Sequence, residues 1–173
     1  MIFRKTTEND IPAILAIYDG ARETMHAAGI DQWVNGYPGE TDLRADIAAG
    51  YSYVLTEDDG TVAATAAILH DGEPTYAVID GAWMTDSPAG AACTYTAIHR
   101  IASARDKRGR GLASRIVSEA ALLAKKEGKI SLRIDTHRDN KPMQGMLARN
   151  GFTQCGVITL VSGALRNAYE KMI

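Results

Sequence analysis

The sequence predicts an α+β fold in which helices flank a mixed, mostly antiparallel sheet. Two observations predict this class: hairpin-type strands come first along the chain, and strands alternate with helices later. The chain has 173 residues, 46% of them hydrophobic, and a chain of this size can bury a core without a disulfide or metal staple. We therefore expect one domain over residues 1–173.

Composition argues against several classes of partner and location. The 19 Lys+Arg and 21 Asp+Glu residues give a net charge of −2, so no overall positive field is present to hold nucleic acid. Cys93 and Cys155 lack the spacing of a zinc site or a disulfide framework, so we expect no metal and a reducing, cytoplasmic environment. No stretch approaches 18 apolar residues, so we expect neither a membrane span nor a secretory signal.

Periodicity and turn residues place the elements of the first half of the chain. Apolar residues at helical spacing follow Thr7 and Asp10, which resemble a helix cap. Alternating patterns on either side of the turn at 58–60 predict a hairpin. The expected elements are a helix over 11–25, a glycine-punctuated loop over 29–39, a short helix over 43–49, strands over 51–56 and 61–69, and a long loop over 70–92 with one strand near 76–79.

The second half is expected to alternate strands and helices. Gly128 and Gly151 each follow a helical pattern and are typical of helix ends, whereas Asn140 precedes Pro142 as a helix cap would. The expected elements are a strand over 93–102, a helix over 112–126, a strand over 130–134, a helix from Asn140 to Gly151, and strands over 152–161 and 168–173.

The strongest chemical signal is the loop between the strand over 93–102 and the helix over 112–126. Its segment Arg105–Gly111 contains four basic residues and two glycines. Glycines allow the backbone to approach a ligand closely, and a helix start adds partial positive charge, so this pattern favours a diphosphate. The alternative is a tight turn with solvated arginines.

Two nucleotide motifs can be compared with the same loop. A P-loop requires Gly-Lys-Ser or Gly-Lys-Thr, and neither occurs in the chain. The dinucleotide pattern GxGxxG is met by Gly109 and Gly111, but Ser114 stands where the third glycine should be. A dinucleotide-binding domain, with Asp135 as the ribose acid, therefore stays as an alternative.

Two regions together resemble a known family. Residues 108–113 fit the motif [QR]xxGx[GA]. They follow Ile98–Ser103, which stand where the splayed central strand of the family precedes this motif. Downstream, residues 135–140 lead into a helix that an asparagine caps and that ends at Gly151-Phe152. In this order and spacing, the chain resembles the GCN5-related N-acetyltransferase (GNAT) family over essentially its whole length.

The resemblance implies a fold, a cofactor and a substrate class. The fold is a central sheet with one splayed strand, the cofactor is acetyl-CoA, and the acceptor is the primary amine of a small molecule or peptide, which attacks the thioester directly. The resemblance also implies that two copies associate through the C-terminal strands. The implied cofactor residues are Arg108, Gly109, Arg110, Gly111, Leu112, Ala113 and Ser114 around the diphosphate, Ile101, Ala102 and Ser103 along the pantetheine arm, and Asn140 and Met143 from the second region.

The chemistry requires a base, because an alkyl ammonium with a pKa near 10.4 must lose a proton before it attacks. His99 is the candidate, since an imidazole titrates near neutrality, and a buried structural histidine is the alternative. The family often has a tyrosine that protonates the leaving thiolate, but here that position is Leu147. Tyr169 is the candidate substitute, with core packing as the alternative.

The acceptor pocket is expected on loops, because loops on a rigid scaffold carry specificity. Gln32, Trp33 and Tyr37 and the segment 70–92 are the expected walls, with coverage of one end of the core as the alternative for the two aromatic residues. A catalytically idle acyl-CoA-binding sensor, suggested by Leu147, is the alternative to an enzyme.

Overall fold

The computed structural model describes all 173 residues, in two units that are taken separately below. Unit 1 contains Met1–Ile68 and Arg100–Ile116, and unit 2 contains Leu69–His99 and Val117–Ile173. Eight strands follow the order β1-β2-β3-β5-β6-β8-β7-β4, with one parallel pair among mostly antiparallel ones, and four α-helices accompany them. The predicted fold class is confirmed, and the expectation of one domain over 1–173 stays a prediction.

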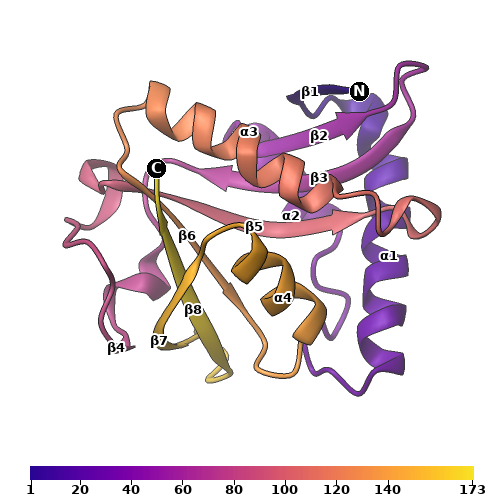
Figure 1. Cartoon of the computed structure of the whole chain (residues 1–173). Helices are drawn as coiled ribbons and strands as arrows, with labels where there is room; N and C mark the ends of the chain where they lie inside the picture. Colours follow the sequence, from indigo (N-terminus) through magenta and orange to yellow (C-terminus); the bar gives the residue numbers. More distant parts are fainter. The chain divides into compact units, whose positions relative to one another are not determined.

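Figure 1 shows the elements in chain order. Two of them belong to both units: β5 (Tyr95–Ser103) begins in unit 2 and α3 (Leu112–Lys126) begins in unit 1. The others are β1 (Ile2–Lys5), α1 (Ile11–Ala27), α2 (Glu40–Ala48), β2 (Ser52–Thr56), β3 (Val62–Leu69), β4 (Asp80–Gly81), β6 (Ser131–Thr136), α4 (Lys141–Arg149), β7 (Thr153–Thr159) and β8 (Leu165–Met172), with short 3₁₀ helices at Glu8–Asp10, Pro74–Ala77, Gly90–Ala92 and Arg105–Lys107.

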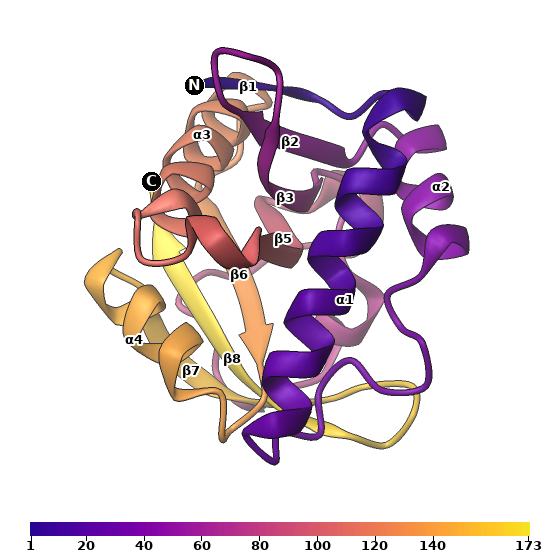
Figure 2. The same ribbon diagram turned by 90° about the vertical axis from the view of Figure 1, so that its right-hand side faces the viewer.

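The core of unit 1 forms on the apolar face of α1. Ile14 and Tyr18 are buried there in one cluster with Leu43 of α2 and Val54 of β2. Figure 2 shows α1 running beside α2, as these contacts require. The helical spacing of the apolar residues after position 10 therefore marked the buried face correctly.

The start of α1 is fixed by the Asp10 carboxylate. Its two oxygens accept hydrogen bonds from the Arg4 guanidinium at 2.7 and 2.9 Å, and the Thr7 amide and hydroxyl both donate to Oδ2 at 2.8 Å. The Arg4 guanidinium outweighs the effect of burial and, with Thr7, lowers the pKa of Asp10 to about 2. The cap predicted from Thr7 and Asp10 is thus present as a local network.

We expect Asp10→Asn to lower the free energy of unfolding by about 2 kcal/mol near neutral pH. The folded pKa lies below the ordinary value of 3.8, so the ionised carboxylate stabilises the fold above about pH 4. This contribution is lost as the pH falls through about 2, because below that pH the carboxyl is protonated in both states. Urea unfolding along an acid titration measures it, and a gap between variant and wild type that does not shrink with acid would refute the ion pair's role.

Strand β5 forms a parallel ladder with β6 over a short stretch. In unit 2 the pairs are Tyr95↔Ser131, Thr96↔Leu132 and Ala97↔Arg133. Beyond this ladder β5 continues to Ser103, and the ladder of β6 with β8 continues to the end of β6 at Thr136. The strand therefore leaves its parallel neighbour part-way along, which is the splay that the resemblance implies.

Helix α4 ends and begins as its sequence predicts. The Asn140 side-chain oxygen Oδ1 accepts a hydrogen bond from the Met143 amide at 3.2 Å, and Gly151 has a φ of +79° just past the last turn. Leu147 is fully buried on this helix. Both views show α4 beside β7 and β8 (Figures 1 and 2).

The strand expected near 76–79 is wrong. Residues Pro74–Ala77 form a 3₁₀ helix, because the Glu73 carboxylate caps it by accepting from the Thr75 amide at 3.0 Å and Pro74 occupies its first position. The strand in this region is the two-residue β4 instead. Tyr76, which looked like a strand residue, is a buried member of the unit 2 core.

Strand β4 pairs with β7 through a very close backbone contact. A Cβ on Gly81 would lie 2.3 Å from the Cys155 carbonyl oxygen, and one on Gly156 would lie 2.2 Å from the Asp80 carbonyl oxygen. Because real Cβ atoms do not approach so closely, only glycine fits at both positions.

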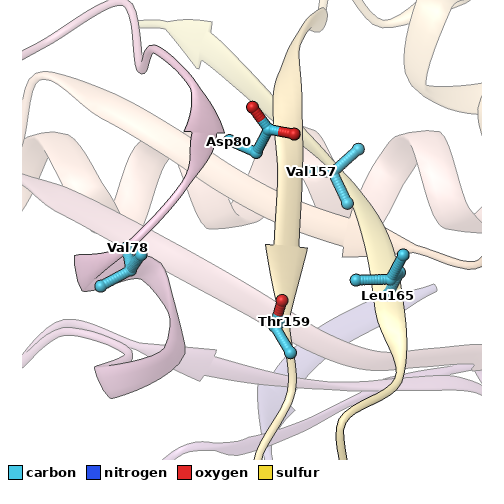
Figure 3. Close-up of a pocket in the computed structure, with 5 residues that line it drawn as sticks. All are labelled: Val78, Asp80, Val157, Thr159 and Leu165. Carbon is cyan, nitrogen blue, oxygen red and sulfur yellow. The ribbon is translucent and has the colours of Figure 1, made fainter.

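A shallow cavity of about 310 Å³ lies at the same edge of unit 2. Figure 3 shows the five lining residues, which come from β7, β8, β4 and the segment before it. They are Val78, Asp80, Val157, Thr159 and Leu165. Val78 and Asp80 belong to the segment 70–92, which was expected to wall the acceptor pocket, whereas the three residues from β7 and β8 were not expected at a site. None of the helices has the length and apolar character needed to cross a membrane.

Candidate active site

The basic loop of unit 1 adopts the backbone that an anion site requires. Gly109 and Gly111 have φ values of +78° and +75°, and a Cβ on either would meet open space. Glycine is therefore needed here for its left-handed conformation rather than for lack of room. Two such residues directly before the first turn of the 15-residue helix α3 form a turn of the kind that binds phosphate through backbone N–H groups.

The arginine side chains of this loop anchor it to the rest of unit 1. Arg108 donates to the Thr24 hydroxyl at 2.7 Å and to the Gly20 carbonyl oxygen at 3.0 Å, both on α1. Arg110 donates to Glu57 at 2.7 Å. Both side chains are exposed, as in the alternative of solvated arginines, but each is held by a partner in unit 1.

The last residues of β5 continue this part of the site. Ile101, Ala102 and Ser103 are half-buried, and Ala102 packs against the core of unit 1. The amide of Ala104 donates to the Ala63 carbonyl oxygen at 2.9 Å, which ties the end of the strand to β3.

The two aromatic residues expected on the acceptor wall differ in their surroundings. Trp33 packs on the core of unit 1, with its ring edge-on to Tyr18 at 5.5 Å between centroids. Tyr37 is 41% exposed, and its hydroxyl accepts from Arg100 at 2.8 Å. Gln32 is half-buried in the same loop. Trp33 therefore covers the core, as the alternative from the sequence proposed, whereas Tyr37 remains accessible to a ligand.

In unit 2, His99 lies between two carboxylates. Its Nε2 is 3.2 Å from Glu73 Oε2, and its Nδ1 is 3.8 Å from Asp135 Oδ1. The Glu73 contact lacks hydrogen-bond geometry, so Nε2 is buried without a hydrogen-bond partner. The Tyr76 hydroxyl donates to the same Asp135 oxygen at 2.8 Å. An imidazole nitrogen without a hydrogen bond, inside a group of acids, is an arrangement suited to proton transfer.

Glu73 is held in place on both its backbone and its side chain. Its carboxylate accepts from the Thr75 amide and hydroxyl at 3.0 and 2.8 Å, and its amide donates to the Tyr95 hydroxyl at 2.9 Å. Burial raises the pKa of Glu73, but His99 and Thr75 outweigh it and lower the pKa to about 2. Glu73 therefore carries a negative charge next to the imidazole throughout the neutral range.

Tyr169 lies away from this cluster. It is buried on β8, its hydroxyl donates to Gln154 at 3.4 Å, and it pairs with Ile134 across the ladder. Directly paired residues share a sheet face, whereas Asp135 faces the other way because neighbours along a strand alternate. The geometry of Tyr169 is that of a packing residue.

Comparison with known proteins identifies the family. A family model described as the acetyltransferase (GNAT) family matches residues 16–152, more than half of the chain. The chain is a GNAT acetyltransferase. A crystal structure of a GNAT acetyltransferase from Streptococcus agalactiae is 34% identical and covers 99% of this chain and 95% of its own, with a TM-score of 0.86.

Other solved structures have the same fold as this GNAT chain. A putative acetyltransferase from Staphylococcus aureus Mu50 is 25% identical, with 99% of each chain covered and a TM-score of 0.71. A GNAT family structure from Listeria monocytogenes is 19% identical, with 99% and 94% covered and a TM-score of 0.74, and it supports the fold alone. A search of curated proteins gives no match.

The GNAT assignment makes the chain an N-acetyltransferase. Glu73, Tyr76 and Asp135 surround His99. Glu73 and Tyr76 belong to the segment 70–92, which was expected to wall the acceptor pocket, but no residue was expected as a partner of His99. Asp135 could have been found, because the carboxyl ends of neighbouring parallel strands meet at one edge of a sheet. Glu73 and Tyr76 come from a long loop whose course no periodicity indicates.

Proposed function

We propose that this acetyltransferase takes its acetyl group from acetyl-CoA and transfers it to the primary amine of a small molecule or peptide, with direct attack on the thioester. The observation that carries the proposal is the glycine turn at the start of α3, with Gly109 and Gly111 both left-handed. Its backbone is suited to a diphosphate, and GNAT acetyltransferases act on amines.

The proposed cofactor residues are taken unit by unit. In unit 1, the backbone of Arg108–Ser114 holds the diphosphate, and the edge of Ile101–Ser103 pairs with the pantetheine arm as an added strand would. In unit 2, Asn140, which caps α4, and Met143 are the other proposed cofactor residues. Acetyl-CoA supplies the acetyl group as an activated thioester.

The amine must lose a proton in forming the amide, and we propose that His99 Nε2 accepts it. This nitrogen has no hydrogen-bond partner, and the charged carboxylate of Glu73 lies beside it to stabilise the imidazolium that forms. Leu147 cannot donate a proton, and Tyr169 is held in packing. A thiol has a pKa near 8.5, so the thiolate leaves without an acid from these positions.

Thermal unfolding with acetyl-CoA, CoA and NAD at matched concentrations tests the cofactor. Acetyl-CoA at 100 times its dissociation constant is expected to stabilise the chain by about 2.7 kcal/mol, which raises Tm by roughly 5 to 10 °C. Stabilisation by NAD alone would instead support a dinucleotide-binding domain. Thiol release with a panel of primary amines then tests turnover, and binding without release for any amine would support an acyl-CoA sensor.

We expect Gly111→Ala to weaken acetyl-CoA binding about tenfold, because a side chain there strains the turn and comes between the backbone and the diphosphate. Gly128→Ala is the matched control at the other end of α3. It also has a left-handed φ, of +70°, and open space around a Cβ. Both variants should lose about 1 kcal/mol of stability, and calorimetric titration should show the affinity loss in Gly111→Ala alone. Equal affinities in the two variants would exclude this turn from the site.

We also propose a cytoplasmic location and association of two copies through the C-terminal strands. Both cysteines are unpaired, as a reducing environment would keep them. Sedimentation of the full chain measures the oligomeric state, and a monomer at all concentrations tested would overturn the proposed association.

A further inference from the structure

Arg100 has a backbone conformation that a strand residue does not normally adopt. Its φ is +52°, in the left-handed region, which is uncommon for residues other than glycine and asparagine. It stands in the middle of β5, one residue before the proposed pantetheine edge at Ile101–Ser103. A single left-handed residue bends a strand and interrupts its pairing, as in a β-bulge. Such a conformation persists only where surrounding contacts hold it.

Those contacts come from two segments of unit 1. The Arg100 guanidinium donates from Nε and Nη2 to the two carboxylate oxygens of Asp46 on α2, at 2.7 and 2.6 Å. Its remaining nitrogen donates to the Tyr37 hydroxyl at 2.8 Å. The side chains of Arg100 and Asp46 are 15% and 8% exposed, so this two-point ion pair is largely shielded from water.

The charge on Arg100 is well supported in this position. Burial alone would lower the pKa of its guanidinium, but Tyr37 and Asp46 outweigh it and raise that pKa above its ordinary value. The group therefore stays charged. One rigid guanidinium connects β5 to α2 and to the loop over 29–39, which contains Tyr37 and is called the acceptor loop below.

We propose that Arg100 and Asp46 are positioning residues that hold the left-handed bend of β5 at residue 100, so that the backbone of Ile101–Ser103 is presented to acetyl-CoA. The same guanidinium fixes Tyr37, so the acceptor loop and the cofactor edge are ordered together. This inference rests on the proposed acetyl-CoA site. Neither residue touches the reacting atoms, so their effect is on binding and order rather than on proton transfer.

The test compares Asp46→Asn with Asp10→Asn in the full chain. The two carboxylates are matched: each receives a two-point contact from one arginine in unit 1, and their side chains are 8% and 7% exposed. Both variants should be less stable than wild type. Calorimetric titration with acetyl-CoA, well below each Tm, should show about a tenfold weaker affinity for Asp46→Asn only. Equal affinities in the two variants would reduce the pair to a structural role and overturn the proposal.

Tyr37→Phe keeps the proposal testable if Asp46→Asn does not fold, because Tyr37 is partly exposed and loses only its hydroxyl. Hydrogen exchange of the loop over 29–39 is the readout. In wild type, acetyl-CoA should slow exchange in this loop, and in Tyr37→Phe this protection should be lost. Protection that persists without the hydroxyl would overturn the link. If acetyl-CoA does not bind even wild type, the proposed function fails first, so the two failures are distinguishable.

Discussion

Replacing His99 with asparagine is expected to lower kcat by about 10² to 10⁴, the range that removal of a general acid or base produces. The proposed site gives the reason, because Nε2 is the buried imidazole nitrogen without a hydrogen bond, beside the charged Glu73. The side chain is not among the cofactor residues, so the affinity for acetyl-CoA should change little. Initial rates of thiol release, together with calorimetric titration, separate the two quantities.

His70→Asn is the matched control for this loss. His70 is another histidine of unit 2, and its Nδ1 lies 2.8 Å from the Thr96 hydroxyl. Because it has no proposed part in proton transfer, kcat should fall by less than about threefold. The kcat of Glu73→Gln should lie between those of His99→Asn and His70→Asn, since this variant loses the charge beside the imidazole but keeps the base. A His99→Asn variant with kcat close to that of His70→Asn would show that another group accepts the proton.

Glu170→Gln is expected to lower the free energy of unfolding by about 3 to 5 kcal/mol, the cost of breaking a buried ion pair. The Glu170 carboxylate is fully buried and accepts from the Ser131 hydroxyl at 2.6 Å, the Met84 amide at 2.6 Å and Arg133 Nε at 3.1 Å. Burial raises the pKa of Glu170, but Ser131, Thr85 and Arg133 together outweigh it and lower that pKa. The carboxylate therefore stays charged in the core.

The surroundings of Arg133, the partner of Glu170, make the loss of stability in Glu170→Gln large. The Arg133 guanidinium lies 4.2 Å from the ring centroids of both Trp83 and Tyr95 and is 4% exposed, so water cannot replace the lost carboxylate. A double variant, Glu170→Leu with Arg133→Met, should recover much of the stability, because it leaves no unpaired charge. Urea unfolding measures both. Glu40→Gln, in an exposed pair with Arg44, should cost less than about 1 kcal/mol, and an equal cost would contradict the argument from burial.

Elements with strong local signals could be predicted from the sequence closely. Helix α3 occupies Leu112–Lys126 as expected, because a glycine stands at each end and the apolar face between them is regular. Elements whose bounds depend on pairing with a neighbouring strand could not be predicted so closely. Strand β8 begins at Leu165 rather than 168, since its first residues are fixed by pairing with β7, which no local pattern reveals.

The candidate site divides in the same way. The anion turn could be found because its glycines, basic residues and helix start are contiguous. The surroundings of His99 could not, since Glu73 lies 26 positions earlier and Asp135 lies 36 positions later in the chain. Arg100 gave no signal at all, because its left-handed backbone depends on Asp46 and Tyr37, and sequence patterns do not report long-range ion pairs.

The glycine contact between β4 and β7 has a consequence for solubility. An outer strand with unpaired N–H and C=O groups is a template on which strands of other molecules add. Here β4 pairs with β7 through Asp80↔Val157 and Gly81↔Gly156, and it is itself too short to serve as such a template. A side chain at Gly81 or Gly156 would push β4 away and uncover β7. Damage at these glycines would therefore appear as aggregation between molecules, with the chemical groups of the active site left intact.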